Sequence, residues 1–126
     1  MRLIASRRMA FRACHSSATA SAARPYLQRV REFYPRTPIF LLLPVWRQDA
    51  GTESPRANAA GQTYAQYRQE LARIAASVAR VTVLEPGELL PPAPALLIDG
   101  LHPNTEGHVV YGLNLAQRLK RLQPAQ

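Results

Sequence analysis

The sequence predicts an α/β domain built around parallel strands. Two short apolar segments, residues 39–43 and 81–84, have the length and composition of strands. Between them, residues 63–78 carry apolar side chains at steps of three and four, the spacing of one helical face. A strand, a helix and a second strand in this order form a βαβ unit, whose strands run parallel.

The first part of this domain is expected to be a helix over residues 24–34. Pro25 suits the first helical position, and Pro35 and Pro38 end the helix. The apolar run at 39–43 then lies between prolines, which is typical of a parallel strand buried on both faces.

The middle of the chain supplies the rest of the βαβ unit. Residues 48–61 are polar, contain glycine and proline, and are expected to form a loop. The helix that follows has an apolar face made of Tyr64, Tyr67, Leu71, Ile74 and Val78. Residues 81–84 are rich in β-branched side chains and predict the second strand.

The C-terminal part is expected to end in a long helix over residues 105–122. Residues 85–95 hold four prolines and predict a loop with one turn at 88–90, followed by a short extended segment at 96–98. Asn104 suits the N-cap of the last helix, and Glu106 is favourable in its first turn.

The formal net charge of +8 comes mainly from arginine, because 15 of the 16 basic residues are Arg and seven precede the first acidic residue, Glu32. Nucleic-acid binding is one interpretation of this charge. No aromatic interleaving or recognition-helix pattern accompanies it, so compositional bias is the preferred interpretation and no nucleic-acid partner is expected. No apolar run has the length of a membrane span.

Residues 1–23 form a basic leader that is separate from the domain expected over 24–126. The leader is Arg-rich and free of acidic residues, which is typical of an organellar transit peptide. A misplaced start or a shifted reading frame is an equal alternative, and then the segment is disordered. Without such targeting the default location is cytoplasmic. The single cysteine, Cys14, excludes an intramolecular disulfide.

The segment that carries chemistry is Asp99-Gly100-Leu101-His102-Pro103. It places a carboxylate three residues before an imidazole at the start of the last helix. In serine hydrolases an imidazole takes the proton of the attacking hydroxyl, and a carboxylate orients the ring and stabilises the imidazolium. Asp99 and His102 are therefore the candidate catalytic residues.

This segment resembles the last motif, Asp-x-x-His-Pro, of the SGNH hydrolases, also called GDSL-type lipases and esterases. Residues 37–47 are similar to the strand that follows the third motif of that family, including Pro44 and Trp46-Arg47. The resemblance covers roughly residues 24–122. It implies part of a three-layer α/β/α, flavodoxin-like domain that hydrolyses small esters through an acyl-enzyme, without a cofactor or metal.

The sequence departs from that family at the nucleophile. It contains no Gly-Asp-Ser and no Gly-x-Asn-Asp motif, and its one Gly-x-Asn, at residues 112–114, falls within the last helix. Ser54 and Ser77 have poor contexts for a nucleophile. The sequence therefore predicts a truncated or weakly active ester hydrolase. The alternative is a non-catalytic binding or assembly protein that associates through an open sheet edge.

Three further side chains are candidates for a role near the site. Trp46 is expected either to wall a substrate cleft or to cap the core, and Arg47 either to pair with a nearby carboxylate or to be solvated. His108 stands six residues after His102, an awkward spacing for two metal ligands on one helix, and is interpreted as an ordinary helix residue. No metal site is expected.

Overall fold

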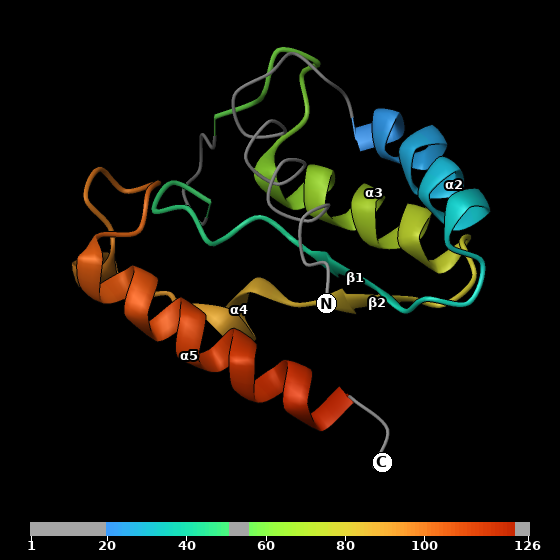
Figure 1. The fold of residues 1–126 in the computed structure, drawn as a ribbon. Coiled ribbons are helices and arrows are strands. Elements are labelled where there is room, and N and C mark those ends of the chain that lie inside the picture. Colours follow the sequence, from blue (N-terminus) through green and yellow to red (C-terminus); the bar gives the residue numbers. More distant parts are fainter. Residues whose placement is uncertain (1–19, 51–55, 123–126) are drawn as a thin grey trace.

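The computed structural model describes residues 20–50 and 56–122 (Figure 1). The elements are η1 (Ala20–Ala22), α2 (Ala23–Phe33), β1 (Ile39–Leu42), α3 (Tyr64–Ala76), β2 (Val81–Leu84), α4 (Pro86–Leu89), η2 (Pro94–Leu96) and α5 (Thr105–Leu122). The predicted α/β fold is confirmed, and β2 and α5 have the predicted bounds. Figure 1 shows α2 and α3 on one side of the strands and α4 and α5 on the other.

The two strands pair in parallel, as the βαβ pattern predicts. Ile39 lies opposite Val81 and Leu42 lies opposite Leu84. The pairing continues past the end of β1, where the Leu43 N–H donates to the Leu84 carbonyl at 3.2 Å. The carboxyl ends of both strands therefore lie at the same end of the sheet. From that end the chain continues to the loop that contains Asp99 and His102.

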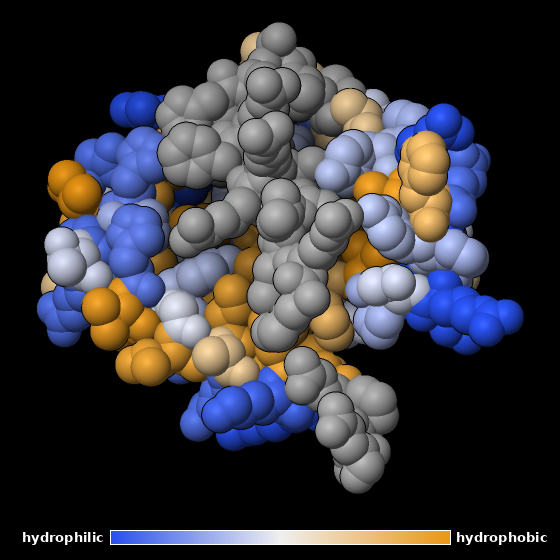
Figure 2. Space-filling view, in the orientation of Figure 1, coloured by the Kyte–Doolittle hydropathy of each residue, from blue (hydrophilic) through white to orange (hydrophobic). Residues whose placement is uncertain are grey.

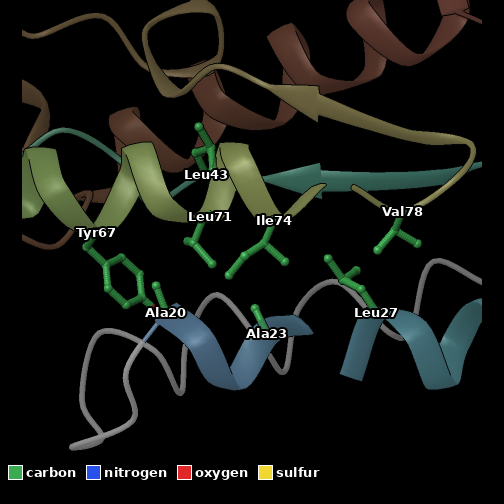
Figure 3. Close-up of a cluster of buried hydrophobic side chains, with 8 residues drawn as sticks. All are labelled: Ala20, Ala23, Leu27, Leu43, Tyr67, Leu71, Ile74 and Val78. Atoms are coloured by element: carbon green, nitrogen blue, oxygen red, sulfur yellow. The ribbon is translucent and has the colours of Figure 1, made fainter. Parts of the chain in front are cut away.

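Helix α3 forms because its first turn is capped and one face is apolar. Thr63 accepts from the Gln66 N–H, and the Gln66 side chain accepts from the Thr63 N–H, which completes a capping box. The apolar face of α3 packs on η1 and α2 (Figure 3). This core cluster contains Ala20, Ala23, Leu27, Leu43, Tyr67, Leu71, Ile74 and Val78.

Two expectations for the N-terminal half need correction. All four residues of β1 are only partly buried, not buried on both faces, because β2 is the one strand beside it in the described ranges. Helical structure also begins before residue 24, since Ala20 and Ala23 are buried against α3. Pro25 is thus the third residue of α2. The expected leader lies outside the described residues up to position 19.

A single guanidinium ties the C-terminal end of α2 to the turn before β2. Arg31 donates to the carbonyls of Tyr34 and Thr37 at 2.6 and 2.8 Å. It also donates to the carbonyls of Ala79 and Arg80 at 2.9 and 3.1 Å. These carbonyls lie in the turns that follow α2 and α3, and the guanidinium joins the two turns.

A second apolar cluster places α5 against the loop that follows β2. Its buried members are Leu90, Leu96 and Leu97, with Val45, Trp46, Ala93, Val110 and Tyr111 packed around them. The loop differs from expectation in two places. Its helical turn is α4, earlier than residues 88–90, and residues 96–98 contribute one bridge, Leu97 to Pro103, instead of an extended segment.

Candidate acid–base site

Asp99 and His102 lie on one tight loop, and the hydrogen bond predicted between them is present. Asp99 Oδ2 is 2.6 Å from His102 Nδ1. The other carboxylate oxygen, Oδ1, accepts from the backbone N–H groups of Leu101 and His102 at 3.0 and 2.7 Å. One oxygen of Asp99 therefore binds the backbone of the loop in an Asx turn, and the other binds the imidazole.

The base of this loop is clamped to the start of α5. The Ile98 N–H donates to the His102 carbonyl at 2.8 Å, which closes the loop. Asn104 then donates its backbone N–H to the Leu96 carbonyl at 2.9 Å. Its side chain accepts from the Gly107 N–H at 2.9 Å and donates to the Ala95 carbonyl at 2.7 Å. The predicted N-cap at Asn104 is thus confirmed, and it joins helix and loop.

The protonation state of the pair follows from its hydrogen bonds. The pKa of Asp99 is held well below its usual range by hydrogen bonds, first from the His102 side chain and then from the His102 and Leu101 backbone N–H groups, which together outweigh an opposing effect of burial. An ionised carboxylate can only accept, so Nδ1 of His102 carries the proton that bridges to Asp99. In the neutral ring Nε2 then holds the lone pair, which is the tautomer that a general base needs.

The site is open to solvent. The side chains of Asp99 and His102 are 50% and 40% exposed. A molecule in solution can therefore approach the imidazole. His108, in the first turn of α5, donates from Nδ1 to the Asn104 carbonyl at 2.9 Å and so stabilises the start of the helix.

Arg47 pairs with a carboxylate, as one of the two interpretations expected, but the partner is Asp49. Nε and Nη2 of Arg47 each lie 2.9 Å from one Asp49 oxygen, in a two-pronged, half-buried pair. Burial acts to raise the pKa of Asp49. Hydrogen bonds from Arg47 and from the Arg56 N–H outweigh it and lower the pKa. The pair closes the loop that leaves β1.

Trp46 lines a cavity of about 330 Å³ at the carboxyl ends of the strands. The other lining residues include Tyr64 and Arg68 of α3 and Glu85, the N-cap of α4, together with residues of α4 and of the loop after it. Arg68 pairs with Glu85 at 2.5 Å, and Tyr64 donates to the Pro44 carbonyl at 2.6 Å. Neither Asp99 nor His102 lines this cavity, so the structure does not unite Trp46 and the pair in one pocket.

Two hydroxyl side chains of the described region, Ser77 and Tyr111, have structural roles. Ser77 ends α3, donating to the Ile74 carbonyl at 2.7 Å and accepting from Arg24 at 2.9 Å. Tyr111 packs in the second cluster, and burial raises its pKa to about 12. Asn114 of the Gly-x-Asn sequence donates to the Leu89 carbonyl at 3.1 Å and fastens α5 to α4. Ser54 and Cys14 lie outside the described residues.

The described residues hold neither a cluster of metal ligands nor a helix suited to span a membrane. Across residues 20–50 and 56–122, no three His, Cys, Asp or Glu side chains are grouped to hold a metal ion. Within the same ranges, none of the helices combines the length and apolar character needed to cross a membrane.

Comparison with known proteins gives one fold similarity. The solved structure of a salicylyl-acyltransferase, SsfX3, from a tetracycline biosynthetic pathway matches with a TM-score of 0.64 at 23% sequence identity. The match covers 82% of this chain but only 32% of that chain, so this chain spans about a third of the neighbour. No family model and no curated protein matches the sequence.

These comparisons overturn the family assignment made from the sequence. No family model supports the SGNH hydrolases, and the matching structure is described as an acyltransferase. The physical reason lies in the shortness of the motif. Asp at position 99 caps two backbone N–H groups, and Pro103 leads into a helix, so local loop geometry by itself favours much of Asp-x-x-His-Pro.

Sequence reasoning also missed residues that shape the site. Gln48, assigned to a polar loop, contacts Gly100 within the Asp99–His102 loop. Tyr64 and Arg68 fall within the helix expected over residues 63–78, and they line the cavity with Trp46. Only the Asp-Gly dipeptide at 99–100, typical of a tight turn, gave a local signal for the first contact.

Proposed function

We propose that Asp99 and His102 form the acid–base pair of an acyl-transfer site that hydrolyses small esters. The observation that carries the proposal is the 2.6 Å hydrogen bond between Asp99 Oδ2 and His102 Nδ1. This bond orients the imidazole and leaves Nε2 as the basic nitrogen. The side chains of the pair are 40–50% exposed, so a substrate can reach that nitrogen. The acyltransferase that shares the fold supports acyl transfer as the class of reaction.

The chemistry proceeds by two proton transfers through one ring. His102 Nε2 takes the proton of the attacking hydroxyl as its oxygen bonds to the ester carbonyl carbon, and Asp99 stabilises the imidazolium. When the carbonyl re-forms and the bond to the leaving alcohol breaks, Nε2 returns the proton to the leaving oxygen. With water as the attacking hydroxyl, the products are a carboxylic acid and an alcohol.

We expect this reaction to be slow in the chain as printed. The described residues place no serine against the pair, so a nucleophilic serine would have to come from outside residues 20–50 and 56–122. A triad enzyme that has lost one member keeps only about 10³–10⁴ in rate over water. A base without a positioned nucleophile therefore gives weak ester cleavage.

The test is hydrolysis of nitrophenyl acetate by the parent chain, His102→Ala and a matched control, His108→Ala. Both histidines lie in the same part of the chain, and only His102 contacts a carboxylate. We expect a low parent rate that falls with His102→Ala and is kept by His108→Ala. Equal rates for all three proteins would refute the proposal. Rapid turnover abolished by a serine-modifying reagent would show a nucleophile that the proposal omits.

A second candidate function is assembly with another copy of this chain through the sheet edge. Within the described ranges β1 pairs with β2 alone, so one edge of each strand has no strand beside it. Exposed strand edges pair readily with other chains. Figure 2 shows apolar side chains gathered on one face of the molecule, and the exposed apolar residues include Ile98, Val109 and Leu113.

Sedimentation equilibrium tests this alternative. Self-association that Phe40→Pro abolishes would support it, because proline removes a ladder N–H from β1. The control is Phe33→Ser, which changes an exposed apolar residue at the end of α2 and leaves the N–H groups of β1 in place. A chain that stays monomeric at high concentration would exclude assembly between copies.

A further inference from the structure

The loop that follows β1 touches the candidate site at one point. The Gln48 N–H donates to the Gly100 carbonyl at 2.9 Å. The Gln48 side chain also lies over Gly100: a Cβ built on that glycine would stand 2.8 Å from Gln48 Oε1 and 3.2 Å from Gln48 Cβ. Backbone and side chain of Gln48 thus both contact Gly100, one of the two residues between Asp99 and His102.

Gln48 is itself held in a closed turn. The Ala50 N–H donates to the Arg47 carbonyl at 3.1 Å, across Gln48. The two-pronged pair of Arg47 and Asp49 flanks Gln48 on both sides in the sequence, and Asp49 also accepts from the Arg56 N–H at 3.0 Å. Just before the turn, Trp46 packs in the second apolar cluster. The turn is therefore anchored to the core at one end and closed by ionic hydrogen bonds.

Gly100 has a conformation that makes this contact consequential. Its φ of +75° lies in the left-handed region, which glycine adopts without strain. The positions of Asp99 before it and His102 after it depend on this one backbone conformation. Any side chain at position 100 would meet Gln48.

We infer that Gln48 is a positioning residue, which holds Gly100 through its backbone hydrogen bond and side-chain contact and so fixes the geometry of the hydrogen bond between Asp99 and His102. It acts through the loop backbone and touches no reacting atom. Its catalytic meaning rests on the proposed acid–base function, but the positioning itself can be measured without any substrate.

The measurement is proton NMR of the full chain with ¹⁵N-labelled histidine. The His102 Nδ1 proton in the bond to Asp99 gives a downfield signal, which a merely structural destabilisation elsewhere does not move. We expect Gly100→Ala to lose this signal, because its Cβ collides with Gln48. The control is Gly61→Ala, at φ +76° with nothing within 4 Å of the added Cβ, which keeps the signal.

The deciding variant combines Gly100→Ala with Gln48→Gly. Removing the Gln48 side chain removes the collision, so we expect the downfield signal to return. A double variant that stays without the signal would overturn the inference, since the backbone conformation at position 100 would then act alone. Retention of the signal in Gly100→Ala would overturn it as well.

Gln48→Gly by itself covers the case in which Gly100→Ala does not fold. We expect the Nδ1 proton to exchange with water about tenfold faster, since residues in contact are coupled by free energies of this order. An unchanged exchange rate would overturn the inference. Failure of the ester assay with these NMR results intact would count against the proposed function alone, so the two can fail separately.

Discussion

Gly107, in the first turn of α5, is the residue whose replacement should most directly separate the helix from the candidate loop. A Cβ at this position would lie 2.3 Å from the Leu96 carbonyl oxygen and 3.1 Å from Pro103 Cβ. Carbon–oxygen contacts are normally about 3.3 Å or longer, so the helix and the loop would have to separate by about 1 Å. That oxygen also accepts the Asn104 N–H at 2.9 Å, a bond that the separation would break.

The expected change in the free energy of unfolding is the sum of opposing contributions. Overpacking of a close contact costs about 1–3 kcal/mol, and loss of one hydrogen bond costs about 1 kcal/mol. Alanine in place of glycine within a helix returns about 0.5–1 kcal/mol. We therefore expect Gly107→Ala to lower the free energy of unfolding by about 2 kcal/mol.

The matched control is Gly112→Ala on the same helix, where the added Cβ has nothing within 4 Å. Only the higher helix propensity of alanine applies there, so this variant should raise the free energy of unfolding by about 0.5–1 kcal/mol. The assay is urea denaturation followed by circular dichroism at constant protein concentration. Equal stability of the two variants would mean that α5 does not pack on Leu96 as described.

Three further predictions concern the rest of the fold. Arg31→Lys should lower stability by about 1–2 kcal/mol, because an ammonium cannot reach four carbonyls as the planar guanidinium does; an unchanged urea midpoint would contradict this. Thr63→Ala should cost about 1 kcal/mol through loss of the capping box of α3, and Thr63→Ser should keep most of it; equal losses would contradict the cap. Burial raises the pKa of Tyr111 to about 12, so its neutral form is favoured in the folded state. Stability should be complete below pH about 10, where an unfolded tyrosine is still neutral, and should fall as the pH rises toward 12. Tyr111→Phe should flatten that alkaline slope, and an identical slope in both proteins would exclude Tyr111 as its source.

Local patterns predicted most of the elements. Residues 81–84 and 105–122 have clear strand and helix signals and clear limits, and the structure gives both elements these bounds. The parallel pairing followed from the order of strand, helix and strand. The hydrogen bond between Asp99 and His102 was predictable because it joins residues three positions apart.

Long-range features could not be predicted in this way. The burial of β1 depends on how many strands lie beside it, which its own composition does not state. The contact between Gln48 and Gly100 joins two loops, and no residue pattern in either loop encodes it. One interpretation of the sequence paired Arg47 with a nearby carboxylate, but no pattern identified Asp49 as the partner. A motif as short as Asp-x-x-His-Pro indicated the site geometry correctly but assigned the wrong family.

The most direct test of the acid–base pair is the rate of ester cleavage by Asp99→Asn. The asparagine carbonyl can still accept the backbone N–H groups of the loop, so the fold of the loop is kept. Its amide would face His102 Nδ1 as a donor, which moves the ring proton to Nε2 and removes the lone pair from the basic nitrogen. We expect Asp99→Asn to cleave nitrophenyl acetate as slowly as His102→Ala, and more slowly than the parent chain. Cleavage by Asp99→Asn at the parent rate would contradict it.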